Sequence, residues 1–587
     1  MNKRKTKIVC TLGPATDNEN VLKQIMLSGM DVGRVNMSHQ DIETQRERIA
    51  MFKKVREEIG LPIGLLLDTK GPEIRTGKFG DDKVILVENQ KFTLTTDDIT
   101  GNNKIVNVSF KDLPKDLSIG DTVLIDDGLI ELRVDNIKEE KNIICTVING
   151  GEVSSHKGIN IPKVHVSLPF LSDKDKEDIK FAVEEDFDFI AASFTRSADD
   201  IMLLKKELAA NGNKVIKIIA KIENFDGVKN IDEIIKVADG IMVARGDLGV
   251  EIPLEDIPII QKELIKKCCK AGKIVVTATQ MLDSMIKNPR PTRAEATDVA
   301  NSVYDGTTAI MLSGETAIGA YPVEAVRTMS KIAVRTEEDI NYIKKFERIN
   351  LKDKNVTSAI SHATCTTAHD IEATAIITVS KSGKTCTSIS KYRPNSPIIA
   401  GTTSKNIMRQ MNLEWGVTPL LIGNSESVDD LFEIIINESK KHNLLKDGDL
   451  VVITAGIPVG LSGTTNLLKV HIVGDILVSG TSITQNSVCA NLCVCKTEEE
   501  LVNKFEIGDI VVLPDVSPDI LPILKNAGGI VCEAPDINSH AAITGLTLNK
   551  PTIVGARHAT DILKSGTTVT LNAARGVVYW QSDKMDF

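Results

Sequence analysis

The sequence predicts an α/β protein built around a (β/α)8 TIM barrel, and three observations support this fold class. Short apolar runs alternate with amphipathic helical stretches in the first half of the chain, as a parallel sheet with crossover helices requires. Charged and hydroxyl side chains follow several of these runs, where barrel enzymes hold their reactive groups. The number of runs matches the strands of such a barrel, and they lie at residues 7–12, 32–37, 64–67, 189–194, 216–222, 240–244, 274–278 and 309–312.

A segment of different character separates the third run from the fourth. Residues 71–165 alternate Val and Ile with polar residues and contain Gly and Asp turns, which is typical of β-hairpins. We therefore expect a small β-barrel domain, residues 71–165, inserted into a barrel domain made of residues 1–70 and 166–338.

Two further domains are expected after the barrel. A helical stretch at residues 323–346 is followed by an α/β pattern that predicts a doubly wound domain over residues 339–474, with apolar runs at 375–379, 398–400, 450–454 and 470–473. Strand-like segments at residues 508–514 and 550–555 predict a separate C-terminal domain over residues 475–587. This organisation suits a chain of 587 residues, because one domain commonly holds about 150 residues.

Composition excludes several classes of function. A net charge of -10 and a pI near 5.6 do not suit a nucleic-acid-binding surface, which needs clustered Lys and Arg. No apolar stretch is long enough for a membrane span, and Gly13 and Pro14 break the run behind the basic N-terminus, so we expect no signal peptide. The ten cysteines show no disulfide framework and are expected to be reduced thiols in a cytoplasmic protein; a zinc site would need a second ligand pair beside Cys489, Cys493 and Cys495.

The fifth and sixth runs lead into one lysine and two carboxylates. Glu223 and Asp247 follow neighbouring strands and can face one another across the barrel mouth, where they could share Mg2+ or Mn2+ with substrate oxygens and water. Lys221 can place positive charge on a phosphoryl group during transfer. The alternative is a surface ion pair of these carboxylates with Lys221 or Arg245.

The other run ends carry further polar groups. Arg34 and Arg75 flank the same mouth and can each make bidentate contacts to phosphate. Thr279 and Ser313 place hydroxyls where a proton donor or relay could sit. The ends of the second and third runs carry side-chain oxygens that suit a hard monovalent cation or a nucleotide, namely those of Asn36, Ser38, Asp68 and Thr69. Taken singly, such amide and hydroxyl groups more often cap loops.

Several long motifs resemble those of the pyruvate kinase family, in the family's order and spacing. They are residues 71–76 (Gly-Pro-Glu-Ile-Arg-Thr), 218–224 (Ile-Ile-Ala-Lys-Ile-Glu-Asn), 244–249 (Ala-Arg-Gly-Asp-Leu-Gly), 278–282 (Ala-Thr-Gln-Met-Leu) and 311–316 (Met-Leu-Ser-Gly-Glu-Thr). The resemblance spans about residues 5–474. It implies a cytoplasmic glycolytic homotetramer that transfers the phosphoryl group of phosphoenolpyruvate to ADP, giving ATP and an enolate that is protonated to pyruvate, with Mg2+ (or Mn2+) and K+ as cofactors.

The resemblance also implies a role for each matching residue. Lys221 would stabilise the phosphoryl group in transfer, and Arg34 would bind the substrate phosphate. Glu73 resembles the family members that depend on K+, so we expect activation by potassium. The remaining roles are Mg2+ ligands (Glu223, Asp247), substrate contacts (Gly246, Asp247, Thr279), the proton path (Ser313), K+ ligands (Asn36, Ser38, Asp68, Thr69) and nucleotide contacts (Asn36, His39, Arg75, Lys157).

Two other segments gain a role in the same way. The inserted domain would be a lid that closes on the nucleotide and excludes water. The α/β domain would be allosteric, with a phosphate-binding loop, otherwise a polar surface turn, made of Ser380, Lys381, Ser382, Gly383, Lys384 and Thr385. The later loop at residues 455–463 has no arginine for a second phosphate, which favours a sugar monophosphate or AMP over a bisphosphate as effector.

The C-terminal domain carries a different resemblance. Residues 536–545 are similar to the phosphohistidine loop of phosphoenolpyruvate-utilising enzymes such as pyruvate phosphate dikinase, which makes His540 a candidate phosphate carrier. Pro535 and Asp536 stand where that loop usually has two glycines, and Asn538 replaces a threonine, so the backbone is poorly suited to approach a phosphate. We therefore expect a structural or regulatory domain.

Two alternative functions remain open at this stage. A dikinase-like phosphotransferase using His540 would need an ATP-grasp module to charge that histidine, and no segment of the sequence resembles one. An inactive metabolite sensor would be expected to have lost some of the reactive residues, but all are present, namely Arg34, Lys221, Glu223 and Asp247.

Overall fold

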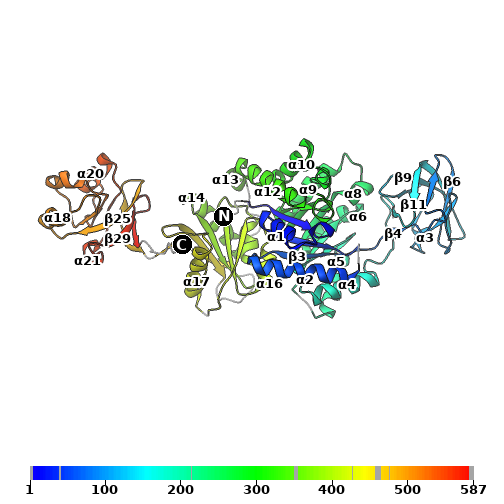
Figure 1. The fold of residues 1–587 in the computed structure, drawn as a ribbon, viewed down its shortest axis with the longest axis horizontal. Coiled ribbons are helices and arrows are strands. Elements are labelled where there is room, and N and C mark those ends of the chain that lie inside the picture. Colours follow the sequence, from blue (N-terminus) through cyan, green and yellow to red (C-terminus); the bar gives the residue numbers. More distant parts are fainter. Residues whose placement is uncertain are drawn as a thin grey trace.

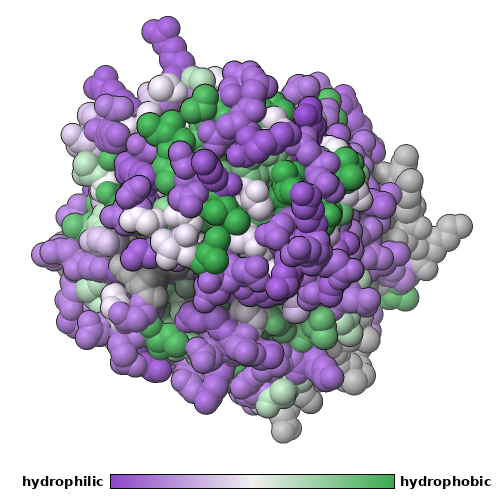
Figure 2. Space-filling model, turned by 90° about the vertical axis from the view of Figure 1, so that its right-hand side faces the viewer, coloured by the Kyte–Doolittle hydropathy of each residue, from purple (hydrophilic) through white to green (hydrophobic). Residues whose placement is uncertain are grey.

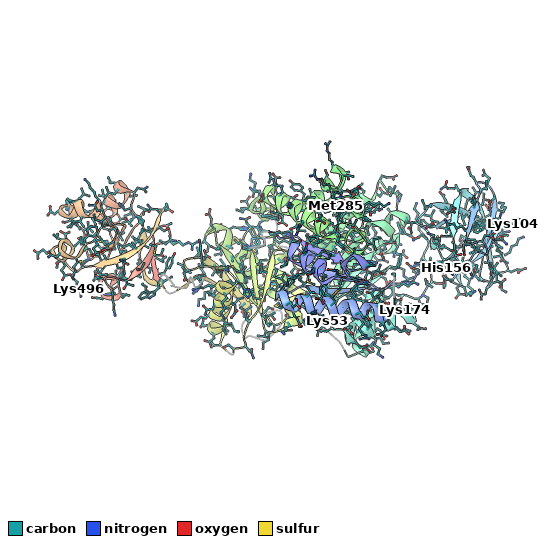
Figure 3. All side chains as sticks on the ribbon, in the orientation of Figure 1. Lys53, Lys104, His156, Lys174, Met285 and Lys496 are labelled. Carbon is teal, nitrogen blue, oxygen red and sulfur yellow. The ribbon has the colours of Figure 1, made fainter. Side chains whose placement is uncertain are left out.

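The computed structural model describes residues 4–38, 41–212, 215–348, 355–425, 427–456, 465–474 and 476–580. The molecule is elongated, with its folded parts arranged in a row (Figure 1). The inserted β domain lies at one end, the barrel and the α/β domain lie side by side in the middle, and the C-terminal domain lies at the other end. Lys104 and Lys496 mark the two ends in Figure 3.

The barrel closes as the sequence predicts. Its eight parallel strands pair in the order β1-β17-β16-β15-β14-β13-β3-β2. Several strands are buried over their whole length, since one face points to the barrel core and the other to the surrounding helices. The strands are β1 (Lys7–Thr11), β2 (Val32–Asn36), β3 (Gly64–Asp68), β13 (Phe189–Ala192), β14 (Lys217–Ile222), β15 (Gly240–Ala244), β16 (Ile274–Ala278) and β17 (Ala309–Leu312).

Helices surround the barrel, and several of them have a side-chain N-cap. The Asp41 side chain accepts the Thr44 N–H where α2 starts, and Thr292 and Glu295 form a capping box at the start of α10. The helices are α1 (Glu19–Ser28), α2 (Ile42–Ile59), α4 (Asp173–Glu184), α5 (Ala198–Ala210), α6 (Phe225–Lys229), α7 (Ile231–Val237), α8 (Arg245–Glu251), α9 (Ile257–Ala271), α10 (Arg293–Asp305), α11 (Gly314–Ala317), α12 (Pro322–Asp339) and α13 (Tyr342–Glu347).

Two helical stretches, one of them predicted at residues 323–346, are each interrupted by an asparagine. The stretch at residues 226–237 forms α6 and α7, because the chain turns at Asn230, whose side chain donates to the Arg196 carbonyl. The stretch at residues 323–346 forms α12 and α13, because Asn341 caps α13 by accepting the Lys344 N–H. An asparagine side chain competes with the helical backbone for hydrogen bonds, which explains both breaks.

The inserted domain contains a seven-stranded sheet in the order β4-β12-β8-β9-β10-β6-β7 and the pair β11-β5. Its first and last strands, β4 and β12, pair with one another. Hydrophilic side chains cover most of this end of the molecule, and the apolar ones occur in separate patches (Figure 2). The elements are β4 (Ile74–Arg75), β5 (Lys83–Leu86), β6 (Lys91–Thr95), β7 (Ile105–Asn107), α3 (Leu113–Asp116), β8 (Thr122–Ile125), β9 (Ile130–Lys138), β10 (Asn142–Asn149), β11 (Gly151–Ser154) and β12 (Gly158–Asn160).

The α/β domain has a sheet in the order β20-β19-β18-β21-β22. The edge strand β20, which contains Pro419, was not predicted. Strand β22 runs antiparallel to β21 and so departs from the predicted parallel pattern. The elements are α14 (Val356–Asp370), β18 (Ala375–Val379), α15 (Lys384–Ser390), β19 (Ile398–Thr402), α16 (Lys405–Met411), β20 (Val417–Leu421), α17 (Val428–Lys441), β21 (Leu450–Gly456) and β22 (Thr465–Ile472).

The C-terminal domain is built on an eight-stranded sheet in the order β23-β30-β29-β25-β26-β27-β28-β24. Its first and last strands, β23 and β30, are again neighbours. Tyr579 of β30 packs against Gly448 of the α/β domain, where φ is +83° and an added Cβ would lie 2.3 Å from the Tyr579 hydroxyl. The elements are β23 (Ile476–Ser479), β24 (Thr481–Ser482), β25 (Ser487–Val494), α18 (Glu498–Lys504), β26 (Ile510–Leu513), α19 (Leu521–Leu524), β27 (Gly529–Cys532), α20 (His540–Leu548), β28 (Thr552–Val554), α21 (Ala559–Ile562), β29 (Thr568–Asn572) and β30 (Val577–Trp580).

The predicted fold class is therefore confirmed, whereas the residue boundaries given above for the domains stay predictions.

A buried ion pair joins the barrel to the α/β domain. Arg409 on α16 donates from Nε to Asp188 Oδ1 at 2.7 Å and lies 2.7 Å from Asp186 through Nη2. The Asp188 side chain is fully buried, and burial raises the pKa of Asp188 to about 6 against the opposing effect of Arg409.

Replacing Arg409 by Met tests this interdomain contact. The variant leaves Asp188 buried without its charged partner, and loss of one partner of a buried ion pair costs about 3–5 kcal/mol. We expect a lower midpoint of thermal unfolding, measured by differential scanning calorimetry. Lys405→Met, an exposed change on the same helix, is the control, and equal midpoints for the two variants would contradict the prediction.

Candidate active site

The carboxyl ends of three barrel strands bring a lysine, an arginine and an aspartate together. Lys221 of β14 lies with its Nζ 3.1 Å from Asp68 Oδ1 and 2.9 Å from Glu223 Oε1. Arg34 of β2 donates from Nε to Asp68 Oδ2 at 2.6 Å and from Nη1 to Thr11 Oγ1 at 2.9 Å. Two cations and two carboxylates are thus arranged in one buried network at the barrel mouth.

The electrostatics of this network keep its lysine charged. Burial by itself would lower the pKa of Lys221, but the Asp68 and Glu223 carboxylates raise it above its ordinary value. Burial would likewise raise the pKa of Asp68, but Lys221 and Arg34 hold it below its ordinary value. An ammonium group is therefore fixed in place before any substrate arrives, as electrostatic catalysis requires.

Glu223 and Asp247 fit a divalent cation. Burial raises the pKa of Glu223 to about 7; Lys221 opposes this rise, and the charge of Asp247 adds to it. Glu223 Oε2 accepts the Phe194 N–H at 2.6 Å, and Asp247 lies in the first turn of α8. Two neighbouring carboxylates whose charges disfavour one another are stabilised by a shared cation, and Mg2+ commonly takes one or two protein carboxylates plus water and phosphate oxygens. Within the described ranges no cluster of three or more metal-ligating side chains occurs.

Thr279 has a strained backbone that several contacts hold. Its φ is +66° and that of Gln280 is +54°, in the left-handed region that a β-branched residue rarely adopts. Arg245 donates from Nη2 to the Thr279 carbonyl at 2.6 Å, and the Gly246 N–H donates to Thr279 Oγ1 at 2.9 Å. Arg245 therefore pairs with this loop and with Asp298 at 2.7 Å and not with Glu223 or Asp247. The other ion pair of the same alternative, Glu223 with Lys221, does form, but it is buried and not on the surface.

Ser313 lies at the end of β17 with a free hydroxyl. Its N–H donates to Glu315 Oε2 at 2.7 Å, while Glu315 Oε1 accepts the Leu282 N–H at 3.0 Å. The Ser313 Oγ is buried and has no hydrogen-bond partner among the residues that the structure describes. Glu315 thus links the two loops that carry Thr279 and Ser313.

The residues expected to hold K+ lie at two adjacent strand ends. Asn36 of β2 is in register with Asp68 of β3, and Asn36 Oδ1 accepts the Ser38 N–H at 3.0 Å. Thr69 is buried and its N–H donates to the Ala191 carbonyl at 3.1 Å. The four residues are close along the two strand ends, and Asp68 is already paired with two cations. His39, a predicted nucleotide contact, lies outside the described residues.

The inserted domain faces this region across a cavity of about 290 Å3, which Glu73, Arg75, Lys157 and Asp247 help to line. Arg75 lies 2.6 Å from Glu73 through Nη2 and donates from Nη1 to the His156 carbonyl at 2.9 Å. His156 is on the barrel side of the inserted domain in Figure 3. Lys157 lies 2.8 Å from Asp126, so both predicted nucleotide contacts are paired within the inserted domain.

Sequence reasoning missed two hydroxyl residues of the network. Ser193 accepts the Lys221 ammonium at 2.7 Å, and its Oγ lies 3.1 Å from Asp68 Oδ1 and 2.7 Å from the Thr69 carbonyl. Thr11 supports Arg34. Both stand at or just after the ends of the first and fourth strands, β1 and β13, so applying the strand-end argument to all eight strands would have found them.

Other predicted site residues lie elsewhere. Residues 380–385 comprise the connection from β18 to α15 and the first two residues of that helix, with Gly383 at φ +75° and the Thr385 hydroxyl 3.2 Å from that of Thr465. Most of the loop at residues 455–463 lies outside the described residues. His540 is the exposed first residue of α20 in the C-terminal domain.

The cysteines are free thiols in this structure. Cys493 and Cys495 are buried with their Sγ atoms 3.8 Å apart, and Cys489 is exposed. No cluster of three or more metal-ligating side chains includes them within the described residues.

Comparison with known proteins decides the family. Three family models match in order: pyruvate kinase, barrel domain, over residues 3–326; pyruvate kinase, alpha/beta domain, over residues 358–471; and PEP-utilising enzyme, mobile domain, over residues 505–576. The chain belongs to the pyruvate kinase family. Its activity is accordingly that of a phosphotransferase of glycolysis, and the resemblance noted in its motifs is confirmed.

Close relatives extend over almost the whole chain. A pyruvate kinase of Sporosarcina psychrophila is 46% identical over 578 residues, covering 98% of this chain and 99% of the relative. A pyruvate kinase of Geobacillus stearothermophilus is 46% identical over 579 residues with the same coverage. Because these relatives include the C-terminal domain, the pyruvate kinase interpretation is favoured over the dikinase and sensor alternatives.

A solved structure gives the same answer for the fold. A crystal structure of a pyruvate kinase from Cryptosporidium parvum has a TM-score of 0.76 and 40% identity, covering 80% of this chain and 96% of its own. Family members generally need metal ions, which agrees with the neighbouring carboxylates of Glu223 and Asp247.

No helix within the described ranges is both long and apolar enough to cross a membrane.

Replacing Ser193 by Ala tests whether its hydroxyl helps to position Lys221. A hydrogen bond to a charged group contributes about 1.5–3 kcal/mol, so losing it should lower kcat by about 10–100-fold in a steady-state assay of pyruvate formation. Ser28→Ala, a change of a half-buried serine at the C-terminal end of α1, is the matched control. An unchanged kcat for Ser193→Ala would show that Asp68 and Glu223 position Lys221 without the hydroxyl.

Proposed function

We propose that the barrel mouth transfers the phosphoryl group of phosphoenolpyruvate to ADP with Lys221 as the central electrostatic group, using Mg2+ or Mn2+ and K+. The observation that supports this most strongly is the buried ammonium of Lys221, 2.9 Å from Glu223 and 3.1 Å from Asp68. A phosphoryl group in transfer carries negative charge on its equatorial oxygens, and a fixed cation stabilises it without reorganisation.

Arg34 and the loop after β16 would bind the substrate on either side of Lys221. The Arg34 guanidinium already points along Asp68 and can turn its remaining N–H groups to the substrate phosphate. The substrate carboxylate would accept hydrogen bonds from the Thr279 hydroxyl and from backbone N–H groups of Gly246 and Asp247. The Gly246 N–H now donates to Thr279 Oγ1, so substrate binding would replace this internal bond.

Glu223 and Asp247 would hold the divalent cation, which supplies positive charge against the phosphoryl and enolate oxygens when bound. Asn36, Ser38, Asp68 and Thr69 would hold K+ beside the phosphate site. The bound cations would neutralise the carboxylates of Glu223 and Asp68, which now pair with Lys221. Lys221 would then be free to contact the substrate.

Proton delivery to the enolate would involve the hydroxyls of Thr279 and Ser313. The Ser313 hydroxyl can form a hydrogen bond to a substrate or a water molecule without breaking an existing one, because it has no hydrogen bond within the described residues. The Thr279 hydroxyl, by contrast, donates to the Ala278 carbonyl at 2.7 Å. Glu315 is buried and fixes both loops, so it would keep the two hydroxyls on the same side of the reacting carbon.

The inserted domain would act as a lid over the nucleotide. Arg75 and Lys157, with Asn36 and His39 from the barrel, would contact ADP and ATP. In the present structure Arg75 and Lys157 are paired with Glu73 and Asp126, and the nucleotide phosphates would compete for these cations as the lid closes. Closure would exclude water from the phosphoryl group, which otherwise could hydrolyse.

Regulation, assembly and location complete the proposal. The loop of Ser380, Lys381, Ser382, Gly383, Lys384 and Thr385 would bind a phosphorylated effector, with its backbone turned at Gly383. Homotetrameric assembly and a cytoplasmic location stay predictions. His540 is exposed but lacks the glycine pair of a phosphate-carrying loop, so the C-terminal domain would have a structural or regulatory role.

The assignment of Lys221 is tested by a coupled assay of pyruvate formed from phosphoenolpyruvate and ADP with Mg2+ and K+. We expect Lys221→Met to lower kcat by about 1,000-fold or more, because the charge on the phosphoryl group is no longer balanced. Removing divalent metal with EDTA should abolish turnover in the wild type, and added Mg2+ should restore it. Lys236→Met, an exposed change on α7, is the control. Full turnover in Lys221→Met, or in EDTA, would refute the assignment.

Potassium dependence is tested at Glu73. Replacing Glu73 by Lys removes a negative charge from the cavity between lid and barrel and adds a positive one that can substitute for the monovalent cation. We expect the wild type to need K+ for turnover and Glu73→Lys to retain turnover without it, as measured by titrating KCl in the coupled assay at constant ionic strength. Glu88→Lys, an exposed change elsewhere in the same domain, should stay K+-dependent. Loss of the K+ requirement in both variants would point to a general charge effect.

A further inference from the structure

One short helix of the barrel, α8, meets the inserted domain that we propose to be a lid. It begins directly after β15, and its first turn holds Asp247, while Glu251 is its last residue. Residues four apart lie on the same face of a helix, about 6 Å apart along its axis. Both residues help to line the cavity between the lid and the barrel. Helix α8 thus presents two carboxylates to this cavity, one at the proposed metal site and one a turn away.

Glu251 accepts hydrogen bonds from the lid. Asn160, the last residue of β12, donates from Nδ2 to Glu251 Oε1 at 3.2 Å. The Ile161 N–H also donates to the Glu251 carboxylate. Burial raises the pKa of Glu251, and these two hydrogen bonds oppose that rise because they favour the charged form. The last turn of α8 is therefore a docking point for one strand of the lid.

A second lid segment approaches the same turn of α8. Gly128 lies in the turn between β8 and β9 and has a φ of +83°, and a Cβ added to it would lie 3.8 Å from Val250 Cγ1. Val250 is the neighbour of Glu251 in α8. The lid therefore meets this helix at two places, the end of β12 and the turn between β8 and β9.

Strand β12 also positions the two lid cations that we assign to the nucleotide. Lys157 directly precedes β12; its N–H donates to Thr76 Oγ1 at 2.9 Å, and the Thr76 N–H donates to the Lys157 carbonyl at 2.8 Å. Arg75 of β4 is paired in register with the first residue of β12. Asn160 is at the other end of this three-residue strand. Fixing Asn160 on α8 therefore fixes Arg75 and Lys157 relative to Asp247.

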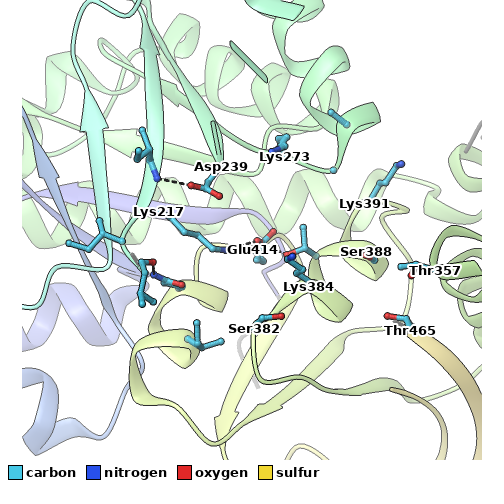
Figure 4. Close-up of a pocket in the computed structure, with 18 of the residues that line it drawn as sticks. Lys217, Asp239, Lys273, Thr357, Ser382, Lys384, Ser388, Lys391, Glu414 and Thr465 are labelled. Atoms are coloured by element: carbon cyan, nitrogen blue, oxygen red, sulfur yellow. Dashed lines mark hydrogen bonds and ion pairs between the residues drawn. The ribbon is translucent and has the colours of Figure 1, made fainter. Parts of the chain in front are cut away.

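The junction at the other end of the barrel is of a different kind, because buried charges hold the α/β domain there. Figure 4 shows the cavity of about 760 Å3 at this junction, where Lys217 Nζ lies 3.3 Å from Glu414 Oε1. Arg409 and Asp188 form a second buried pair. Both residues of the lid contact are only half buried. Breaking a buried ion pair is costly, whereas a partly exposed hydrogen bond can be replaced by one to water, so the lid junction is the one suited to open and close.

We propose that Glu251 is a positioning residue for the nucleotide. By accepting from Asn160 it holds β12 on α8, and it thereby sets Arg75 and Lys157 at a fixed distance from Asp247. The inference rests on the proposed function, which assigns these two cations to the nucleotide, and adds the residue that fixes their position. Glu251 itself would contact neither substrate. Its loss should therefore weaken the binding of ADP and spare that of phosphoenolpyruvate, which groups of the barrel hold.

Steady-state kinetics of the full chain separate the two substrates. We expect Glu251→Ala and Asn160→Ala each to raise the KM for ADP about tenfold, because each removes a hydrogen bond to a charged group, and to change the KM for phosphoenolpyruvate by less than about twofold. Glu251→Gln keeps a side-chain oxygen that can accept from Asn160, so it should restore the KM for ADP. The matched controls are Glu255→Ala, at an exposed glutamate just after α8, and Asn103→Ala, at an exposed asparagine of the lid.

A double variant tests whether Asn160 and Glu251 act through one contact. If they do, replacing both by Ala should raise the KM for ADP no further than either single change does. Effects that multiply in the double variant would show two independent roles and overturn the proposal. Asn160→Ala leaves the barrel sequence unchanged, so it keeps the test valid if Glu251→Ala does not fold.

Two measurements check the same contact without turnover. Isothermal titration calorimetry of the full chain with ADP and Mg2+ should show the same loss of affinity in Glu251→Ala and in Asn160→Ala. Hydrogen–deuterium exchange of the β12 amides should be faster in both variants, while exchange in β10, which lies inside the lid sheet, should stay as in the wild type.

The outcomes separate this role from simpler ones. Wild-type affinity for ADP in Glu251→Ala would overturn the proposal. An equal rise in KM for both substrates would also overturn it, because it would show that Glu251 maintains α8 around Asp247 and not the lid. A full chain that binds ADP in a Glu251-dependent way but forms no pyruvate would refute the proposed function and leave this inference standing.

Discussion

The architecture of this protein depends on one buried ammonium group held between carboxylates. Lys221 sits between Asp68 and Glu223, on strands that are not neighbours, and Ser193 on the intervening strand completes its contacts. Removing these charges from water costs several kcal/mol per ion unless the partners are well placed. The closed barrel, whose hydrogen-bonded strands fix the spacing between their ends, holds this arrangement in place.

A second constraint acts on the backbone beside this network. Thr279 has a positive φ, a conformation that costs about 1–3 kcal/mol. Arg245 holds its carbonyl and Gly246 holds its hydroxyl, while Glu315 ties the same loop to that of Ser313. The hydroxyl that would meet the substrate is therefore positioned in part by Arg245 and Glu315, which would not contact the substrate themselves. This explains why the motifs around β15, β16 and β17 are longer than their reactive residues require.

Much of this arrangement could be predicted from the sequence, because periodicity and strand ends are local properties. The eight strands and the positions of Lys221, Glu223 and Asp247 follow from apolar runs and what succeeds them. Ser193 was missed because a lone hydroxyl after a strand looks like a capping group, and β20 because its proline argues against a strand. Contacts such as Arg409 with Asp188 join residues over two hundred positions apart, so no local pattern announces them.

The two accessory domains share a way of joining the rest of the chain. In the inserted domain the entering strand β4 pairs with the leaving strand β12, and in the C-terminal domain β23 pairs with β30. Each domain therefore starts and finishes at one place on its own sheet, and the inserted domain imposes little separation on the two barrel segments that it joins. A unit closed in this way can be inserted or removed without changing the spacing of the host strands on either side of it, so the registration of the barrel does not depend on the length of the insertion.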